Sequence, residues 1–225
     1  MTPSSMPLHG TVYGVLLNSQ AEWQACEADM PSLPYKAAPV APVLYVKTAN
    51  TWTPHLGAIV VPAGHTEVEI GATLGLVLSE QGAWRGFVLL NDVSLPHSIA
   101  EQGFYRPPVK YKCLDSFLGV GPHLLPAADL PQPNHLILEV RVNDVLCQQV
   151  DLGRMRRPLS TLVADVSEFM TLRPADVLML GLDVCDSGPD AGRRPRARIG
   201  DVIDIRVPSV PGLGVMQHRL TGEGA

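Results

Sequence analysis

The sequence predicts a strand-dominated α+β fold with few helices, and three observations lead to that prediction. Hydrophobic residues make up 46% of the 225 residues and charged residues only 17%, which is typical of a well-buried chain with one sizeable core. The 20 glycines and 21 prolines indicate many turns. The longest regular pattern alternates with a period of two, and only one segment has convincing helical periodicity.

Residues 1–42 are expected to form a small N-terminal appendage. Within it, the apolar run at 11–17 predicts a strand, and residues 20–28 predict a short helix. The chain is then interrupted by Pro31, Pro34, Pro39 and Pro42. Prolines at this density indicate a loop, so the main domain is expected to begin at residue 43 and to run to residue 225.

The main domain opens with a predicted strand at 43–47 and continues with strict alternation over 68–78. Apolar side chains there alternate with glutamate, glycine and threonine, which predicts a half-buried strand whose second face is small and acidic. Further strands are predicted at 86–91, 136–142, 145–150, 177–182 and 201–207, with a turn at 143–144. The one convincing helix has a proline suited to its first turn and a single apolar stripe, formed by Leu159, Leu162, Val163, Val166 and Met170.

Charge and composition exclude several classes of function. The net charge of −5 and the pI near 5.8 argue against nucleic acid or a membrane surface as a partner, because both require a positive face. The four cysteines are far apart and lack zinc-ligand spacing, so reduced thiols are expected. No signal-peptide pattern or long apolar window is present, so the expected location is cytoplasmic.

One pair of residues indicates chemistry. The predicted strand at 86–91 runs into Asp92, and Lys112 follows twenty residues later. A carboxylate can hold a divalent cation, and an ammonium group can hold an anionic substrate. Together they are the two halves of a site for keto-acid chemistry.

These residues belong to a series of motifs that resembles the fumarylacetoacetate hydrolase family from residue 43 onward. The motifs are Gly86-Phe-x-x-x-Asn-Asp92, the segment 112–122, the hairpin Val142-Asn-Asp-x-x-x-Gln148 and Thr171-Leu-Arg-Pro-Ala-Asp176. The resemblance implies a mixed β-sheet rolled into a partly open barrel or sandwich. It also implies a dimer with the site at the mouth of the barrel.

A narrower resemblance points to one subgroup of that family. Asn91-Asp-Val-Ser-Leu-Pro96, Phe104-Tyr-Arg-Pro107 and Gly71-Ala-Thr73 look like the N-terminal half of the bifunctional isomerase/decarboxylases of 4-hydroxyphenylacetate degradation. The implied substrate is 5-carboxymethyl-2-hydroxymuconate, or the related 5-oxopent-3-ene-1,2,5-tricarboxylate, handled through an enolate. The implied partners are this small di- or tricarboxylic acid and either a second copy of the chain or a paralogous subunit.

The family resemblance further implies Mg²⁺ or Mn²⁺, held by two glutamates on one strand and an aspartate at the end of another. Asp92 matches the aspartate, and two registers compete for the glutamates: Glu67 with Glu69, or Gly71 with Thr73. Four residues of strand span about 13 Å, so only one pair can converge with Asp92. The second register is favoured because Gly71-Ala-Thr73 itself resembles the subgroup. It leaves one carboxylate and weak or absent metal binding.

The resemblance also suggests roles for the other site residues. Lys112 would hold a substrate carboxylate or stabilise an enolate, with a solvated loop lysine as the alternative. Tyr105 and Arg106 would grip the distal carboxylate of a diacid, with a salt bridge at a dimer seam as the alternative. Lys47 and Asn91 complete the expected substrate-binding set, although a lysine at a strand end is usually exposed.

Two departures from the family pattern bear on activity. Residues 180–183 read Leu-Gly-Leu-Asp where the family has Thr-Gly-Thr-Pro, and residues 96–97 read Pro-His where it has Arg-Asp. Two alternatives to the isomerase/decarboxylase therefore remain: a non-catalytic scaffold subunit paired with a metal-competent paralogue, and a metal-dependent acylpyruvate-type hydrolase that uses Glu67, Glu69 and Asp92. The basic run between residues 193 and 198 is expected to be a solvated loop.

Overall fold

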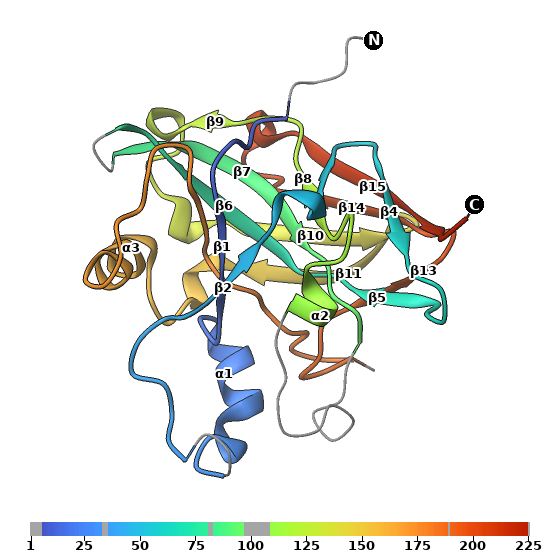
Figure 1. Cartoon of the computed structure of the whole chain (residues 1–225), viewed down its shortest axis with the longest axis horizontal. Coiled ribbons are helices and arrows are strands. Elements are labelled where there is room, and N and C mark those ends of the chain that lie inside the picture. The colour runs from blue at the N-terminus through green and yellow to red at the C-terminus, as the bar shows by residue number, and fades with distance from the viewer. Residues whose placement is uncertain (1–5, 33–35, 81–82, 97–108, 189, 225) are drawn as a thin grey trace.

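A large rolled sheet organises the molecule (Figure 1). The structure is a computed structural model that describes residues 6–32, 36–80, 83–96, 109–188 and 190–224. The large sheet has the strand order β2-β1-β12-β6-β7-β8-β3, with β9 paired to β7. Its strands are β1 (Val12–Leu16), β2 (Val43–Lys47), β3 (Trp52–Pro54), β6 (Ala72–Leu78), β7 (Trp84–Asp92), β8 (Leu118–Val120), β9 (Leu125–Pro126) and β12 (Val177–Met179).

A second sheet packs against the first and has the order β11-β10-β14-β15-β4, and β13 and β5 form a separate two-stranded ribbon. The strands of this sheet and ribbon are β4 (Ala58–Val61), β5 (Glu67–Glu69), β10 (Ile137–Val142), β11 (Val145–Asp151), β13 (Arg196–Arg198), β14 (Val202–Arg206) and β15 (Val215–Gly222). The predicted turn at 143–144 joins β10 to β11, and both of its residues have positive φ, as a tight hairpin requires.

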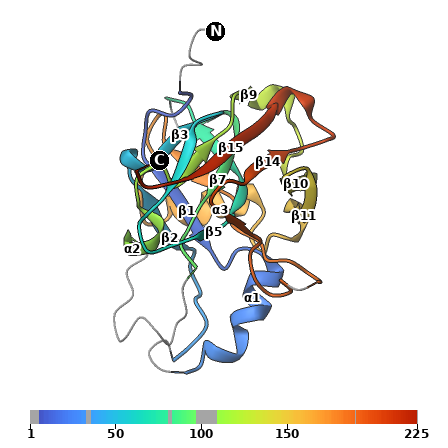
Figure 2. The same ribbon diagram turned by 90° about the vertical axis from the view of Figure 1, so that its right-hand side faces the viewer.

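Helices are short and lie outside the sheets (Figures 1 and 2). They are α1 (Gln20–Cys26), α2 (Val109–Lys112) and α3 (Leu159–Ser167). The predicted stripe on α3 is confirmed in part, since Leu159, Leu162 and Val166 are buried. α1 begins at Ser19, whose hydroxyl oxygen accepts the backbone N–H of Glu22 at 2.9 Å.

The large sheet is mixed and curls on itself. β1 pairs in parallel with β12 and β3 with β8, whereas the other pairs of this sheet are antiparallel. Its two edge strands, β2 and β3, are separated in sequence only by a short turn at Ala49–Thr51. The inner face of the roll holds one apolar cluster with members from six strands. The expected strand-dominated, rolled mixed sheet is therefore confirmed.

The strand at 68–78 differs from its prediction. It breaks at residues 70–71 into β5 and β6, and every residue of β6 is buried. One face of β6 packs in the core between the two sheets and the other faces the inside of the roll. The alternation therefore reports two different apolar environments and not a solvent-exposed face.

The first 42 residues contribute to this architecture. β1 lies between β2 and β12, with Gly14 paired to Tyr45 and Val12 to Val177. The predicted domain boundary at residue 42 stays a prediction. The four cysteines are free thiols, and no helix in the described ranges is long and apolar enough to cross a membrane.

Candidate active site

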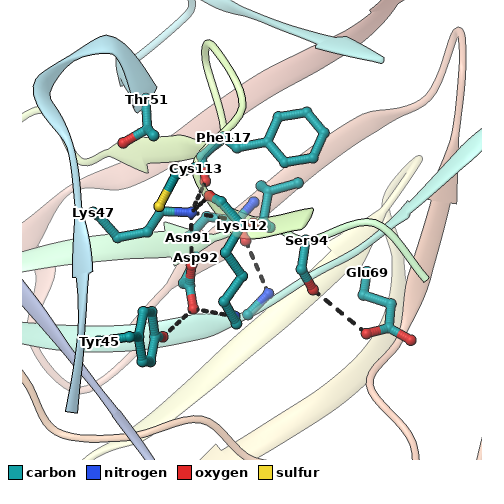
Figure 3. A network of polar contacts seen from close by, with 12 residues as sticks. Tyr45, Lys47, Thr51, Glu69, Asn91, Asp92, Ser94, Lys112, Cys113 and Phe117 are labelled. Carbon is teal, nitrogen blue, oxygen red and sulfur yellow. Dashed lines mark hydrogen bonds and ion pairs between the residues drawn. The ribbon is translucent and has the colours of Figure 1, made fainter. Parts of the chain in front are cut away.

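Asp92 is the centre of a buried ionic cluster inside the roll (Figure 3). It is the last residue of β7, and its carboxylate is withdrawn from solvent. The Lys47 ammonium lies 2.9 Å from Oδ1, and the Lys112 ammonium lies 2.6 Å from Oδ2. The Tyr45 hydroxyl donates a further hydrogen bond to Oδ2. Three predicted site residues therefore meet in space, and Tyr45 is an addition that the sequence did not indicate.

Lys47 also ties β2 to α2 and to the chain segments next to β7 and β8. Its ammonium donates to the carbonyl oxygen of Phe117 at 2.8 Å, to that of Val93 at 3.3 Å and to that of Lys112. These bonds and the ion pair to Asp92 satisfy a charge that would be costly to bury alone. Lys47 is thus buried, not exposed as strand-end lysines usually are, and its role in substrate binding stays a prediction.

Tyr45 fits into the cluster because the neighbouring strand has no side chain there. A Cβ at Gly14, its partner across β1 and β2, would overlap the Tyr45 ring. The ring also supports Lys112, whose Nζ lies 4.9 Å from the ring centroid. Burial and the neighbouring Asp92 raise the pKa of Tyr45 well above its ordinary value, so the phenol stays protonated and remains a donor.

The cluster carries one more positive charge than negative. Burial alone would raise the pKa of Asp92, but Lys112 and Lys47 hold the pKa well below its ordinary value, so the carboxylate is ionised. Burial lowers the pKa of Lys112 to about 8, while Asp92 acts in the opposite direction. One carboxylate thus faces two ammonium groups, which makes the inside of the roll favourable for an anion.

The strand register places Gly71, not a glutamate, against Asp92. The Asp92 N–H donates to the Gly71 carbonyl oxygen at 2.8 Å, and Thr73 pairs with Leu90 two residues away. A Cβ at Gly71 would collide with the Asp92 carbonyl oxygen and lie 3.0 Å from Cδ2 of Leu182. The Thr73 hydroxyl is buried and has no hydrogen-bond partner within the described part of the chain.

Glu67 and Glu69 lie on β5 and face arginines of the adjacent ribbon strand. Arg196 contacts Oε1 of Glu67 at 2.8 Å and Oε1 of Glu69 at 3.5 Å, and Arg198 contacts Glu67 at 3.6 Å. Over the described ranges, no three His, Cys, Asp or Glu side chains gather in a way that could hold a metal ion.

The remaining predicted residues have different placements. Asn91 is buried, and its Oδ1 accepts the Gly71 N–H at 3.0 Å, so this amide supports the backbone beside Asp92. Tyr105 and Arg106 lie outside the described residues.

A cavity of about 410 Å³ opens beside Lys112. Its walls come from α1, from the residues around β1 and β2, from α2 and from the loop before β13, and Figures 1 and 2 show α1 below the large sheet. Most of the lining is apolar, and four lining residues are charged: Glu22, Asp29, Lys112 and Arg194. Apolar walls with a few converging charges are typical of a small-molecule site.

Sequence reasoning missed Glu22 and misplaced Arg194. The expectation of a solvated basic loop is wrong at this position, since the Arg194 side chain is only 12% exposed. Its guanidinium donates to the Ser94 hydroxyl at 3.4 Å and lies 3.9 Å from Oε1 of Glu22. Glu22 follows Ser19 at the spacing of a helix capping box, which was a visible signal for a helix start but not for a pocket.

The fold and the buried ionic cluster define a rolled-sheet protein with a charged pocket at one end of the roll. The chain belongs to the fumarylacetoacetate hydrolase family, because the family described as "Fumarylacetoacetate (FAA) hydrolase C-terminal" matches residues 11–221. It is 30% identical over 216 residues to the 4-hydroxyphenylacetate degradation bifunctional isomerase/decarboxylase of Salmonella dublin, covering 92% of this chain and 46% of that protein. The corresponding Escherichia coli protein is 32% identical over 184 residues, covering 77% of this chain and 41% of that protein. The chain thus spans less than half the length of these relatives.

Solved structures share the fold. The 5-carboxymethyl-2-hydroxymuconate delta-isomerase from Mycobacterium smegmatis aligns with a TM-score of 0.73 and 23% identity, covering 99% of this chain and 82% of that one. The maleylpyruvate hydrolase from Sphingobium sp. SYK-6, in complex with manganese(II) and pyruvate, aligns with a TM-score of 0.68 and 18% identity, covering 96% and 72%. The family resemblance expected from the motifs is therefore confirmed.

Proposed function

We propose that this chain is an isomerase of unsaturated hydroxy- or keto-dicarboxylates, with 5-carboxymethyl-2-hydroxymuconate as the type of substrate, and that it works without a divalent cation. The observation that carries the proposal is the shared cavity of Lys112 and Arg194, two cations that can face the two ends of a diacid. Relatives that are isomerase/decarboxylases support the reaction class.

The residues around Asp92 do not fit a divalent cation. Both carboxylate oxygens already contact ammonium groups, and Gly71 supplies no donor atom where a second carboxylate would be required. A dication placed there would also be repelled by Lys47 and Lys112 at close range. The cluster instead provides its own positive charge. The glutamates that the hydrolase alternative requires are paired with Arg196.

Lys112 would stabilise the charge that develops during isomerisation. Removal of the hydroxyl proton of a hydroxydiene, or of a proton on the carbon beside a conjugated carbonyl, leaves negative charge on an oxygen atom. An ammonium group in a water-poor pocket offsets that charge. Asp92 and Tyr45 position this ammonium. Arg194 would bind a substrate carboxylate through its planar guanidinium.

The other predicted roles remain part of this proposal. Tyr105 and Arg106 would bind the distal carboxylate, and Asn91 would contribute through the backbone it supports. We also propose assembly as a homodimer or with a paralogous subunit, on the basis of the family resemblance. A cytoplasmic location is proposed because the sequence shows no signal-peptide pattern.

The test is an absorbance assay of 5-carboxymethyl-2-hydroxymuconate turnover by the purified full chain, with excess EDTA or with added Mn²⁺. We expect equal rates in both conditions and no single-site heat signal when the protein is titrated with Mn²⁺. Lys112→Met should lower kcat by about 100-fold or more. Lys110→Met, an exposed lysine on the same helix, is the matched control and should leave kcat unchanged.

Activity that appears only with Mn²⁺ would contradict the cation-free mechanism. A folded chain without any turnover would instead favour the non-catalytic scaffold.

A further inference from the structure

Glu22 brings a carboxyl group into the cavity from α1, and no predicted role accounts for it. The side chain is 9% exposed, and it lines the same cavity as Lys112 and Arg194. Its Oε2 accepts the Leu17 N–H at 2.6 Å, while Oε1 lies 3.9 Å from the nearest Arg194 nitrogen. The second distance is too long for a hydrogen bond, so Oε1 has room to accept one from a bound molecule.

The surroundings of Glu22 favour a proton carrier over a permanent ion. Burial raises the pKa of Glu22, while Arg194, the Leu17 N–H and Lys112 act in the opposite direction and Asp183 adds to the rise. Cys26 on the same helix and Asp29 just beyond it also line the cavity. A carboxyl group whose pKa lies closer to neutrality can both accept and return a proton near physiological pH.

We propose that Glu22 is the catalytic residue that moves the proton during isomerisation. It shares the cavity with Arg194, whose guanidinium binds a substrate carboxylate, and with Lys112, whose ammonium group faces the developing enolate. This proposal rests on the proposed function and names the base that the function lacks.

In the first step, the Glu22 carboxylate removes the proton from the hydroxyl group of the substrate's hydroxydiene. The O–H electron pair stays on the oxygen and gives a dienolate, whose charge Lys112 offsets. In the second step, the Glu22 carboxylic acid donates a proton to the carbon at the far end of the diene, which becomes a conjugated ketone. The double bond moves, no atom is gained or lost, and no further reactant is required.

A purely structural role is the competing explanation, because Glu22 holds the Leu17 N–H at the start of α1. Glu22→Gln separates the two roles: glutamine keeps an acceptor oxygen for that N–H but cannot carry the proton. Glu27→Gln, which changes an exposed glutamate just after α1, is the matched control.

The experiment measures four quantities in each variant of the full chain: kcat and KM for 5-carboxymethyl-2-hydroxymuconate, the rate of deuterium uptake at carbon in D₂O by mass spectrometry, and the thermal midpoint. We expect Glu22→Gln to lower both kcat and the rate of deuterium uptake by about 100-fold or more, with KM within about threefold of the wild type. The thermal midpoint should change by less than about 4 °C. Glu27→Gln should match the wild type in all four measurements.

Wild-type kcat and deuterium uptake in Glu22→Gln would overturn the inference and leave the proposed function standing, whereas an inactive wild type would overturn both. If Glu22→Gln does not fold, the pH profile of the wild type decides. Its kcat/KM should fall on acidification with a pKa above the ordinary glutamate value of 4.5, and a flat profile down to pH 4.5 would exclude Glu22 as the base.

Discussion

The ammonium group of Lys112 lies 2.6 Å from Oδ2 of Asp92, and both side chains are withdrawn from solvent. Asp92 ends a central strand and Lys112 ends a short helix, twenty positions apart in sequence. A buried ion pair of this kind is held by surrounding donors, here Lys47 and Tyr45. Removal of one member should therefore be felt in stability as well as in activity.

Asp92→Asn should destabilise the protein strongly. It would leave two buried ammonium groups without a counter-charge, which typically costs about 3 kcal/mol or more. Chemical denaturation should show a matching fall in the free energy of unfolding. Glu67→Gln is the control, because its ion pair with Arg196 is partly exposed and should contribute less than about 1 kcal/mol. Equal stability of Asp92→Asn and the wild type would refute the arrangement described here.

Gly14→Ala should be costly only when Tyr45 is present. The new methyl group would overlap the Tyr45 ring, and overpacking of this kind costs about 1–3 kcal/mol. In a Tyr45→Ala background the same change should cost less than about 1 kcal/mol, because the ring is gone. Free energies of unfolding for the two single variants and the double variant measure this coupling. Additive costs would show that the two residues do not compete for space.

Arg194→Met should weaken substrate binding more than it slows the chemical step. The guanidinium is proposed to bind a carboxylate of the diacid, so we expect KM to rise about tenfold or more. Arg193→Met is the control, because Arg193 is the next residue in the chain and its side chain is exposed. Steady-state kinetics of both variants provide the measurement. A similar KM for the two variants would place the substrate carboxylate elsewhere.

Acidification should destabilise the protein through His218. This histidine is buried on β15, its Nε2 lies 3.3 Å and 3.1 Å from the carbonyl oxygens of Thr53 and Pro54, and burial lowers its pKa from 6.5 to about 4. Between pH 6.5 and 4, His218 is protonated in the unfolded chain but stays neutral in the folded chain. The free energy of unfolding therefore falls as the pH drops through this range.

The pKa difference corresponds to about 3 kcal/mol over that window. His218→Gln can still donate to the same carbonyl groups but does not titrate. Denaturation at pH 7 and pH 4.5 should therefore show a smaller loss of stability in the variant than in the wild type. An identical loss in both would assign the acid sensitivity to other groups.

Local patterns predicted much of this fold. The strand at 43–47 has the predicted bounds, and the hairpin between β10 and β11 and the helix α3 occur where alternation, turn residues and helical periodicity place them. The last strand, β15, was missed even though its buried residues alternate with more exposed ones. The two-sided burial of β6 was also missed, because period-two alternation cannot distinguish one buried face from two.

The residues of the candidate site were also predicted only in part. Asp92 and Lys112 were identified because they lie in recognisable motifs, and their partnership was expected. Arg194 and Glu22 are 172 positions apart, and no local sequence pattern predicts that they are close. They meet because the loop that carries Arg194 folds over the cavity. Tyr45 could not be predicted as a site residue either. Its ring occupies the space opposite Gly14, which pairs with it across β1 and β2 and has no side chain.

The sequence by itself therefore determined the strand-dominated class, the family and the acid–lysine pair, because these are carried by short motifs and residue periodicity. The tertiary structure decided which groups surround that pair and where the cavity lies. Strand register set a glycine against Asp92, and long-range packing brought a glutamate and an arginine to Lys112. Those choices depend on contacts between segments remote in sequence, for which neighbouring residues carry no information.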